Sequence, residues 1–316
     1  MAGANGPKLF GVLVTFRRPA ALSVMLRRLA EQDRPLDRLV VLDNQPMSET
    51  RALVGAFAER GHVVDYVPAP ENLGPGGGVA EGMERILEIA DDLDWITVLD
   101  DGDPPDSATI LAELVEFGQA MLARDPMTGA VGLVGGRFDW KRGLMIRPPD
   151  EELSGPVPVD VIAGNSLPFF LAGAIREVGT FSRDVFFGFE ELEHGLRLRK
   201  AGYSVYADGT HWRQRRADAG RLELDIRPSR GLSPPTWRKY YSMRNAIYIL
   251  RSHGRRGAAL RVTLVRGLGK PLANLPISPG AAVRQLGMNW RACRDAWTGR
   301  MGRRVEPDSG YELPTS

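Results

Sequence analysis

The chain has 316 residues with a net charge of +2, a length that suits one large domain or a domain plus an appendage. Of its residues, 43% are hydrophobic and 25% charged, as in soluble globular proteins. Cys293 is the only cysteine, which excludes an intramolecular disulfide and favours a reducing, cytoplasmic location. No apolar run approaches the length of a membrane span, and residues 1–7, expected to be disordered, do not resemble a signal peptide.

Apolar runs and amphipathic stretches alternate through the first 70 residues. Short strands are predicted over Leu9–Phe16, Leu39–Leu42 and Val63–Val67, and helices over Ala20–Gln32 and Ser48–Arg60. Such strand–helix alternation predicts an α/β fold, in which helices flank one mostly parallel, Rossmann-like sheet.

A glycine-rich stretch, ENLGPGGGV (71–79), precedes a predicted helix over Ala80–Ala90. Such a stretch lets the backbone approach a phosphate closely at a helix N-terminus. Its spacing matches neither the dinucleotide-binding pattern nor a Walker A motif, so a flexible turn is an equal alternative.

The stretch WITVLDDGDPP (95–105) is a predicted buried strand that ends in three acids, Asp100, Asp101 and Asp103. A strand that ends in this way places its acids at the carboxyl edge of the sheet, where open α/β folds bind ligands. Asp101 and Asp103 can point toward one cation, and carboxylate oxygens suit Mn²⁺ or Mg²⁺. An acidic surface turn is the alternative interpretation.

The following segments are predicted to be a helix over Ser107–Arg124, strands over Ala130–Phe138, Val157–Ala163 and Ser204–Ala207, and a strand passing into a helix over Phe169–Val178. Between them, FFGFEELEH (186–194) opens a further helix. Glu190 and Glu191 occupy its first turn, where the helix dipole by itself favours acids. Asp218–Pro235 is predicted to be a mobile connection, and an aromatic helix follows over Trp237–Leu250.

Together, six motifs in this order resemble the inverting glycosyltransferases of family 2, which have a GT-A fold: VTFRRP, VVLDN, ENLGPGGGVAEG, LDDGDPP, FFGFEELEHGLRLRKAGY and YYSMRN. The resemblance covers about Leu9–Asn245 and is greatest to bacterial enzymes that transfer rhamnose, galactofuranose or similar sugars. It implies a catalytic domain over residues 8–216 and a C-terminal helical, basic extension over 217–316.

The resemblance also implies roles for individual residues. Asp101 and Asp103 match the DxD motif that binds Mn²⁺ or Mg²⁺ and the diphosphate, and His211 lies where some members have a third metal ligand. The residues implied to bind the nucleotide or donor sugar are Thr15, Arg17, Asp43, Asn72, Gly74, Asp100 and Arg244. Of these, Asp43 matches the acid that reads the N3–H of uracil or thymine.

Inverting transfer needs a base that takes the proton of the acceptor hydroxyl. The family places it at the second acid of a Glu-Asp pair, which implies Glu191 here. The pair in this sequence is Glu-Glu, so Glu190 is kept as a second candidate. The implied reaction moves a sugar from a UDP- or dTDP-sugar to a hydroxyl of a lipid-linked, polysaccharide or natural-product acceptor.

The C-terminal part of the chain is strongly basic. Residues 237–304 contain 15 Lys and Arg but one acid, Asp295, whereas residues 1–236 have a net charge of −9. Ala258–Leu268 and Ala281–Trp297 are predicted amphipathic segments. Two hypotheses follow: peripheral contact with the cytoplasmic face of a membrane, or a segment that forms an interface of a homo-oligomer or covers the donor site. No nucleic-acid-binding motif accompanies the charge.

Other functions fit parts of the sequence. A sugar nucleotidyltransferase would need a basic, glycine-rich loop after its first strand, which VTFRRP does not supply. A non-catalytic nucleotide-sugar-binding protein would need no base. An NAD dehydrogenase is disfavoured by the glycine spacing and by the cluster of acids.

Overall fold

The computed structural model describes residues 6–222 and 237–306. Residues 1–5 of the predicted disordered terminus and most of the predicted connection at 218–235 lie outside this part. The chain forms two compact units: unit 1 comprises residues 1–137, 147–182 and 191–224, and unit 2 comprises residues 138–146, 183–190 and 225–316. The sequence suggested a division at residue 216, but not the two earlier segments that belong to unit 2.

An eight-stranded sheet has the order β3-β2-β1-β4-β10-β5-β11-β8. Its strands are β1 (Leu9–Thr15), β2 (Arg38–Asp43), β3 (Val64–Pro68), β4 (Trp95–Asp100), β5 (Thr128–Gly132), β8 (Pro156–Pro158), β10 (Phe169–Leu171) and β11 (Ser204–Asp208). The pairs β1–β2, β1–β4, β2–β3 and β5–β11 are parallel, whereas β10 and β8 run antiparallel to their neighbours. The predicted mostly parallel α/β sheet is therefore confirmed.

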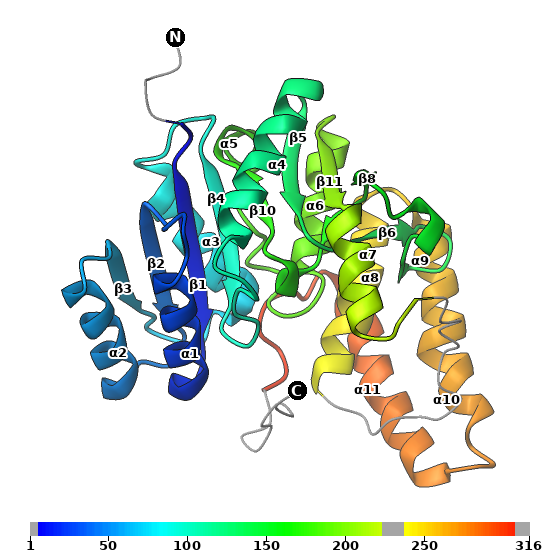
Figure 1. Cartoon of the computed structure of the whole chain (residues 1–316). Helices are drawn as coiled ribbons and strands as arrows, with labels where there is room; N and C mark the ends of the chain where they lie inside the picture. Colours follow the sequence, from blue (N-terminus) through cyan, green and yellow to red (C-terminus); the bar gives the residue numbers. More distant parts are fainter. Residues whose placement is uncertain (1–5, 223–236, 307–316) are drawn as a thin grey trace. The chain divides into compact units, whose positions relative to one another are not determined.

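Helices cover both faces of the N-terminal strands. Helices α1 (Pro19–Ala30) and α2 (Ser48–Glu59) lie on one face, and α3 (Gly74–Leu87) lies on the other (Figure 1). In α1, Pro19 occupies the first turn, where its missing N–H costs no hydrogen bond. Its buried residues recur at helical spacing and are Leu22, Met25, Leu26 and Leu29.

The glycine-rich stretch has a different structure from the one predicted. Helix α3 begins at Gly74, so the run of glycines forms its first turns rather than a loop before residue 80. A Cβ atom on Gly78 would lie 2.9 Å from Val14, and one on Gly82 would overlap with Val12. These two glycines therefore let α3 pack closely on the sheet, while the predicted role of the start of this helix in binding the donor stays a prediction.

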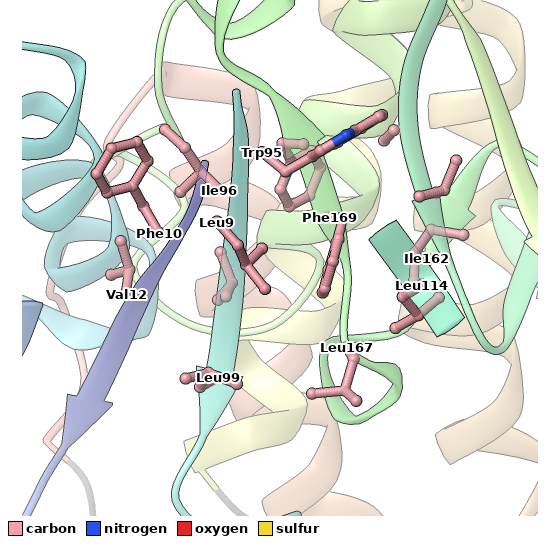
Figure 2. Close-up of a cluster of buried hydrophobic side chains, with 14 of the residues drawn as sticks. Leu9, Phe10, Val12, Trp95, Ile96, Leu99, Leu114, Ile162, Leu167 and Phe169 are labelled. Carbon is pink, nitrogen blue, oxygen red and sulfur yellow. The ribbon is translucent and has the colours of Figure 1, made fainter. Parts of the chain in front are cut away.

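The main hydrophobic core forms around β1, β4 and β10, where Leu9, Trp95, Ile96 and Phe169 are fully buried (Figure 2). Helix α4 (Ile110–Arg124) packs against this sheet. A Cβ atom on its Gly118 would lie 2.8 Å from the Trp95 ring, so only glycine permits this close approach.

Several predicted strands are shorter than expected. The stretch 130–138 forms β5 and β6 (Gly135–Asp139), and the stretch 157–163 forms β8 and β9 (Val161–Ile162), because turns interrupt both. The remaining elements of unit 1 are η1 (Asp150–Glu152), η2 (Gly164–Ser166), α5 (Ala172–Val178), α7 (Gly209–Asp218) and most of α6 (Glu190–Lys200). His211, expected at the end of a strand, lies in the first turn of α7.

Unit 2 is mainly helical. It contains β7 (Leu144–Ile146), α8 (Trp237–Ser252), α9 (Arg256–Val262), the π-helical η3 (Thr263–Gly269), α10 (Lys270–Ala273) and α11 (Pro279–Thr298). The two predicted amphipathic segments are therefore helical. Helix α8 contacts α9 and α11.

Candidate active site

The carboxyl ends of β1, β2 and β4 lie next to one another because the three strands are parallel. In the register of the sheet, Thr15 at the end of β1 is opposite Asp43 of β2, and Val14 is opposite Asp100 of β4. The sheet therefore brings the predicted residues Thr15, Asp43 and Asp100 to one edge, where open α/β folds bind ligands.

Asp101 is buried at this edge, where it contacts Thr15, the last residue of β1, and Arg18, in the loop that follows. Its Oδ2 atom accepts a hydrogen bond of 2.8 Å from the Thr15 hydroxyl, and its Oδ1 atom lies 2.5 Å from Nη1 of Arg18. Burial raises the pKa of Asp101 to about 6, although Arg18 and Thr15 act in the opposite direction. The carboxylate is thus poorly solvated and depends on neighbouring positive charge.

The acidic turn, residues 100–103, is held by its own backbone. Gly102 N–H donates to Oδ1 of Asp100 (3.0 Å), and Asp103 N–H donates to the Asp100 carbonyl (3.0 Å). The pKa of Asp103 is raised, first by burial and then by the negative charge of Asp100, while Arg215 and Arg18 oppose this effect. Asp100 and Asp103 also raise the pKa of Asp101 by their negative charge, a repulsion that a bound cation would relieve.

Asp43 is fully buried, and its carboxylate is occupied within the protein. It accepts hydrogen bonds from the backbone N–H groups of Gln45 and Met47 and from the Tyr66 hydroxyl (2.9 Å). Burial and the Asp43 carboxylate raise the pKa of Tyr66 to about 12. In this structure Asp43 holds the loop after β2, and its predicted contact with a nucleobase stays a prediction.

The loop after β1 carries exposed Arg17 in a left-handed conformation, with φ of 56°. A residue with a side chain adopts this conformation at a cost of about 1–3 kcal/mol, and such residues are common at binding sites. Arg17 lies over the Phe16 ring and donates to the side chain of Gln45. Its side chain thus joins the loops that follow β1 and β2.

Asn72 and Gly74 lie where α3 begins. The Asn72 side chain accepts a hydrogen bond of 2.9 Å from Gly74 N–H, and Asn44 bonds both Leu73 N–H and the Gly74 carbonyl. These contacts fix the start of α3 next to the loop after β2. Asn44, which directly follows the predicted nucleotide-binding residue Asp43, therefore positions the start of α3.

Glu191 lies against the short η2 turn. A Cβ atom on Gly164 would overlap with the Oε1 atom of Glu191, so the carboxylate rests on the bare backbone of this glycine. Burial raises the pKa of Glu191, a hydrogen bond with its own backbone acts in the opposite direction, and the negative charge of Asp100 raises the pKa again. A carboxylate with a raised pKa is a better proton acceptor than an ordinary one.

Glu190 and Glu191 differ in their surroundings although they are adjacent. Glu190, the first residue of α6, is buried and belongs to unit 2. Glu191 belongs to unit 1 together with Asp100, Asp101 and Asp103. Within unit 1 the electrostatic effect of Asp100 on Glu191 thus connects the predicted base with the acidic turn.

His211 lies on the same face of α7 as Arg215, which interacts with Asp103. Among residues 6–222 and 237–306, no group of three or more His, Cys, Asp or Glu side chains is arranged to hold a metal ion. The predicted set of Asp101, Asp103 and His211 is therefore not assembled as three protein ligands. Two carboxylates still fit Mn²⁺ or Mg²⁺, which commonly take further oxygen ligands from water or a phosphate.

Arg244 belongs to unit 2 and is fully buried in α8. Its guanidinium donates to the carbonyls of Asp184, Val185 and Gly302, with distances of 3.2, 2.8 and 2.5 Å. Asn245 donates to the carbonyls of three residues of the 183–190 segment, namely Val185, Phe187 and Gly188. These contacts explain the burial of Arg244, and its predicted contact with the diphosphate stays a prediction.

Sequence reasoning missed three residues of the site. Arg18 follows Arg17 directly, and only the fold shows which of the two arginines reaches Asp101. Gly164 and Arg215 lie far along the chain from the acids, and no local pattern marks either residue.

Residues 12–117 match the sequence model of Glycosyl transferase family 2. The chain is also 27% identical over 259 residues to "Galactofuranosyltransferase GlfT1" of Mycobacterium tuberculosis, an alignment that covers 78% of this chain and 84% of that protein. The chain is a glycosyltransferase with a family 2 domain. The galactofuranosyltransferase GlfT1 of Mycolicibacterium smegmatis is 30% identical to this glycosyltransferase over 203 residues, 60% of this chain and 65% of that protein.

The fold of this glycosyltransferase is GT-A. A similar solved structure is that of GalNAc-T7 with UDP, GalNAc and Mn²⁺, with a TM-score of 0.55 and 12% identity, covering 78% of this chain and 48% of that one. The family match runs from within β1 to the middle of α4, and so includes the loop after β1, the loop after β2 and the acidic turn. It favours glycosyl transfer over the nucleotidyltransferase and dehydrogenase alternatives.

Proposed function

We propose that this glycosyltransferase is a metal-dependent, inverting enzyme that moves a sugar from a UDP- or dTDP-sugar to an acceptor hydroxyl. The observation that carries the proposal is the pairing, within unit 1, of the acidic turn after β4 with a carboxylate, Glu191, whose pKa is raised. The acidic turn suits a cation that neutralises the diphosphate leaving group, and Glu191 suits removal of the acceptor proton.

Asp101 and Asp103 are the residues that would hold Mn²⁺ or Mg²⁺. When bound, the ion would neutralise charge on the diphosphate as the glycosidic bond breaks. Asp100 is proposed to bind the ribose, and Thr15, Arg17, Asn72 and Gly74 to line the nucleotide and donor site. Arg18 is added to this set because its guanidinium contacts Asp101 of the acidic turn.

Glu191 is proposed as the general base. Its carboxylate takes the proton of the acceptor hydroxyl, and the oxygen then attacks the anomeric carbon from the face opposite the leaving nucleotide, so that the anomeric configuration inverts. Glu191 is favoured over Glu190 because burial and the negative charge of Asp100 in the acidic turn raise its pKa.

The galactofuranosyl group is the first candidate for the transferred sugar, because the mycobacterial relatives are named galactofuranosyltransferases. A lipid-linked or polysaccharide acceptor is proposed, with a natural-product acceptor as the alternative.

The proposal is tested by incubating the full chain and Mn²⁺ with UDP-galactofuranose, UDP-galactopyranose or dTDP-rhamnose and with lipid-linked and soluble glycan acceptors. Nuclear magnetic resonance of the product then gives the anomeric configuration. We expect transfer from at least one donor with inversion, and loss of transfer with a chelator. Retention of configuration, or full transfer with the chelator, would contradict the proposal.

A further inference from the structure

Exposed apolar side chains gather in one stretch of unit 2. Among the described residues, fourteen large hydrophobic side chains are exposed, and half of them lie between residues 260 and 290. These seven are Leu260, Leu264, Val265, Leu272, Ile277, Val283 and Trp290. Such a concentration is typical of a surface that contacts a partner or a membrane.

The stretch forms a helical hairpin. One arm is the continuous run of α9, η3 and α10, the other arm is α11, and the two arms contact each other (Figure 1). Backbone hydrogen bonds from Ile277 and Ser278 to Asn274 order the turn between them. Residues 270–284, which we call the hairpin tip, present Ile277 with 80% of its surface exposed, and Leu272 and Val283 flank it.

Helix α11 buries two polar residues and exposes two large apolar ones between residues 283 and 290. Gln285 and Asn289 are buried and bond each other (2.7 Å), and Asn289 donates to the Gly267 carbonyl of η3 (2.9 Å). Val283 and Trp290 are 60% and 62% exposed. The two residues lie on one face of the helix because they are seven positions apart. The outward face is thus not the ordinary polar side of a surface helix.

The charge around these side chains has one sign. Residues 252–294 contain no Asp or Glu. The exposed basic residues of this stretch are Arg255, Arg256, Arg261, Lys270, Arg284, Arg291 and Arg294. An amphipathic surface that combines apolar and basic side chains in this way is attracted to anionic phospholipid.

We propose that the hairpin tip docks peripherally on an anionic phospholipid surface. Ile277, Leu272 and Val283 enter the headgroup region, and Lys270 and Arg284 contact lipid phosphates. Docking of two hairpins of this chain on each other would bring like charges together, which disfavours a second copy as the occupant. No helix in the described part of the chain is long and apolar enough to cross a membrane, so the proposed contact is peripheral.

The first experiment is co-sedimentation of the full chain with phosphatidylcholine vesicles, with and without phosphatidylglycerol, at low and high salt. We expect binding only with phosphatidylglycerol and weakening by salt. Ile277→Glu should reduce the partition coefficient about tenfold, because it removes a large apolar side chain. The matched control is Leu93→Glu, at a position in unit 1 that is 61% exposed.

Charge is tested with Lys270→Gln/Arg284→Gln, which should lower the partition coefficient about fivefold for each residue changed. Its control, Arg27→Gln/Arg60→Gln, removes the same charge from exposed positions of unit 1. An equal fall of the partition coefficient in both double variants would show a non-specific charge effect and overturn the docking site.

Insertion is tested with Ile277→Trp, which should gain fluorescence quenching by brominated phosphatidylglycerol, whereas Leu93→Trp should not. Absence of vesicle binding at low salt overturns the proposal. A concentration-dependent dimer that Ile277→Glu abolishes, in the absence of vesicle binding, would assign the tip to a second copy instead. None of these measurements requires sugar transfer, so their outcome is independent of the proposed function.

Discussion

The Nη1 atom of Arg18 lies 2.5 Å from the Oδ1 atom of Asp101, and the two residues are 83 positions apart in the sequence. Asp101 is the buried acid of the turn after β4 and a proposed metal ligand. The protein therefore supplies its own cation to this carboxylate. A divalent ion that binds Asp101 has to share or replace this contact.

Arg18→Gln is expected to increase the Mn²⁺ affinity of the nucleotide-free enzyme about fivefold, because it removes a competing contact of about 1 kcal/mol from a partly exposed pair. Calorimetric titration with Mn²⁺ measures this change. The control is Arg28→Gln, since Arg28 forms an exposed ion pair of its own, with Glu31. A lower Mn²⁺ affinity in Arg18→Gln would show that Arg18 assists the metal site.

Asp103→Ala is expected to abolish transfer and the part of nucleotide-diphosphate binding that depends on Mn²⁺. The remaining acids of the turn cannot provide the same pair of oxygen ligands. Thermal stabilisation by UDP, measured with Mn²⁺ and then with a chelator, separates nucleotide binding that depends on Mn²⁺ from binding that does not. Glu116→Ala, which changes an exposed acid of α4, serves as the control. Undiminished Mn²⁺-dependent stabilisation of Asp103→Ala would exclude Asp103 as a ligand.

Glu191→Gln is expected to lower kcat by about 10²–10⁴-fold, the usual contribution of a general base, while nucleotide binding stays within about twofold. In the unmodified enzyme kcat should fall as the pH is lowered through the raised pKa of Glu191, because the protonated carboxyl cannot accept a proton. This fall should begin at a higher pH than for an ordinary glutamate. Loss of activity in Glu190→Gln with full activity in Glu191→Gln would reverse the assignment.

Glu191→Gln is also expected to stabilise the fold at neutral pH. A raised pKa means that the folded protein binds this proton more tightly than the unfolded chain, so the charged carboxylate lowers the free energy of unfolding. This loss of stability grows as the pH rises from the pKa of Glu191 in the unfolded chain to its pKa in the folded protein. Urea denaturation should show a larger gain for Glu191→Gln at neutral than at acidic pH, and an equal gain at both would refute this linkage.

Gly164→Ala is expected to lower kcat about a hundredfold, because the added methyl group would occupy the space of the Glu191 carboxylate and displace it. The KM for the nucleotide sugar should change little. Gly55→Ala provides a matched control, since a Cβ atom on Gly55, in α2, would meet no atom within 4 Å. Equal kcat values for the two variants would mean that Glu191 is not held by this contact.

The sequence predicted the features that depend on neighbouring residues. The alternation of apolar runs and amphipathic stretches predicted the parallel β1–β4 region, since burial of one face imposes a local period. The acids after Trp95–Leu99 predicted an acidic turn at the carboxyl edge, because a buried strand has to end where charges begin. The motifs in their order predicted a family 2 glycosyltransferase domain, which the family match supports.

Only the tertiary structure decided features that join distant segments. The glycines of α3 appeared to be a loop because sequence does not reveal that Val12 and Val14 press against them. Asp43 turned out to be buried with Tyr66, and Arg18 rather than Arg17 reached Asp101. Glu191 and Gly164 meet because the chain returns to the same place after 27 residues. Contacts of this kind depend on how whole elements pack, and packing is set by the complete fold rather than by any local pattern.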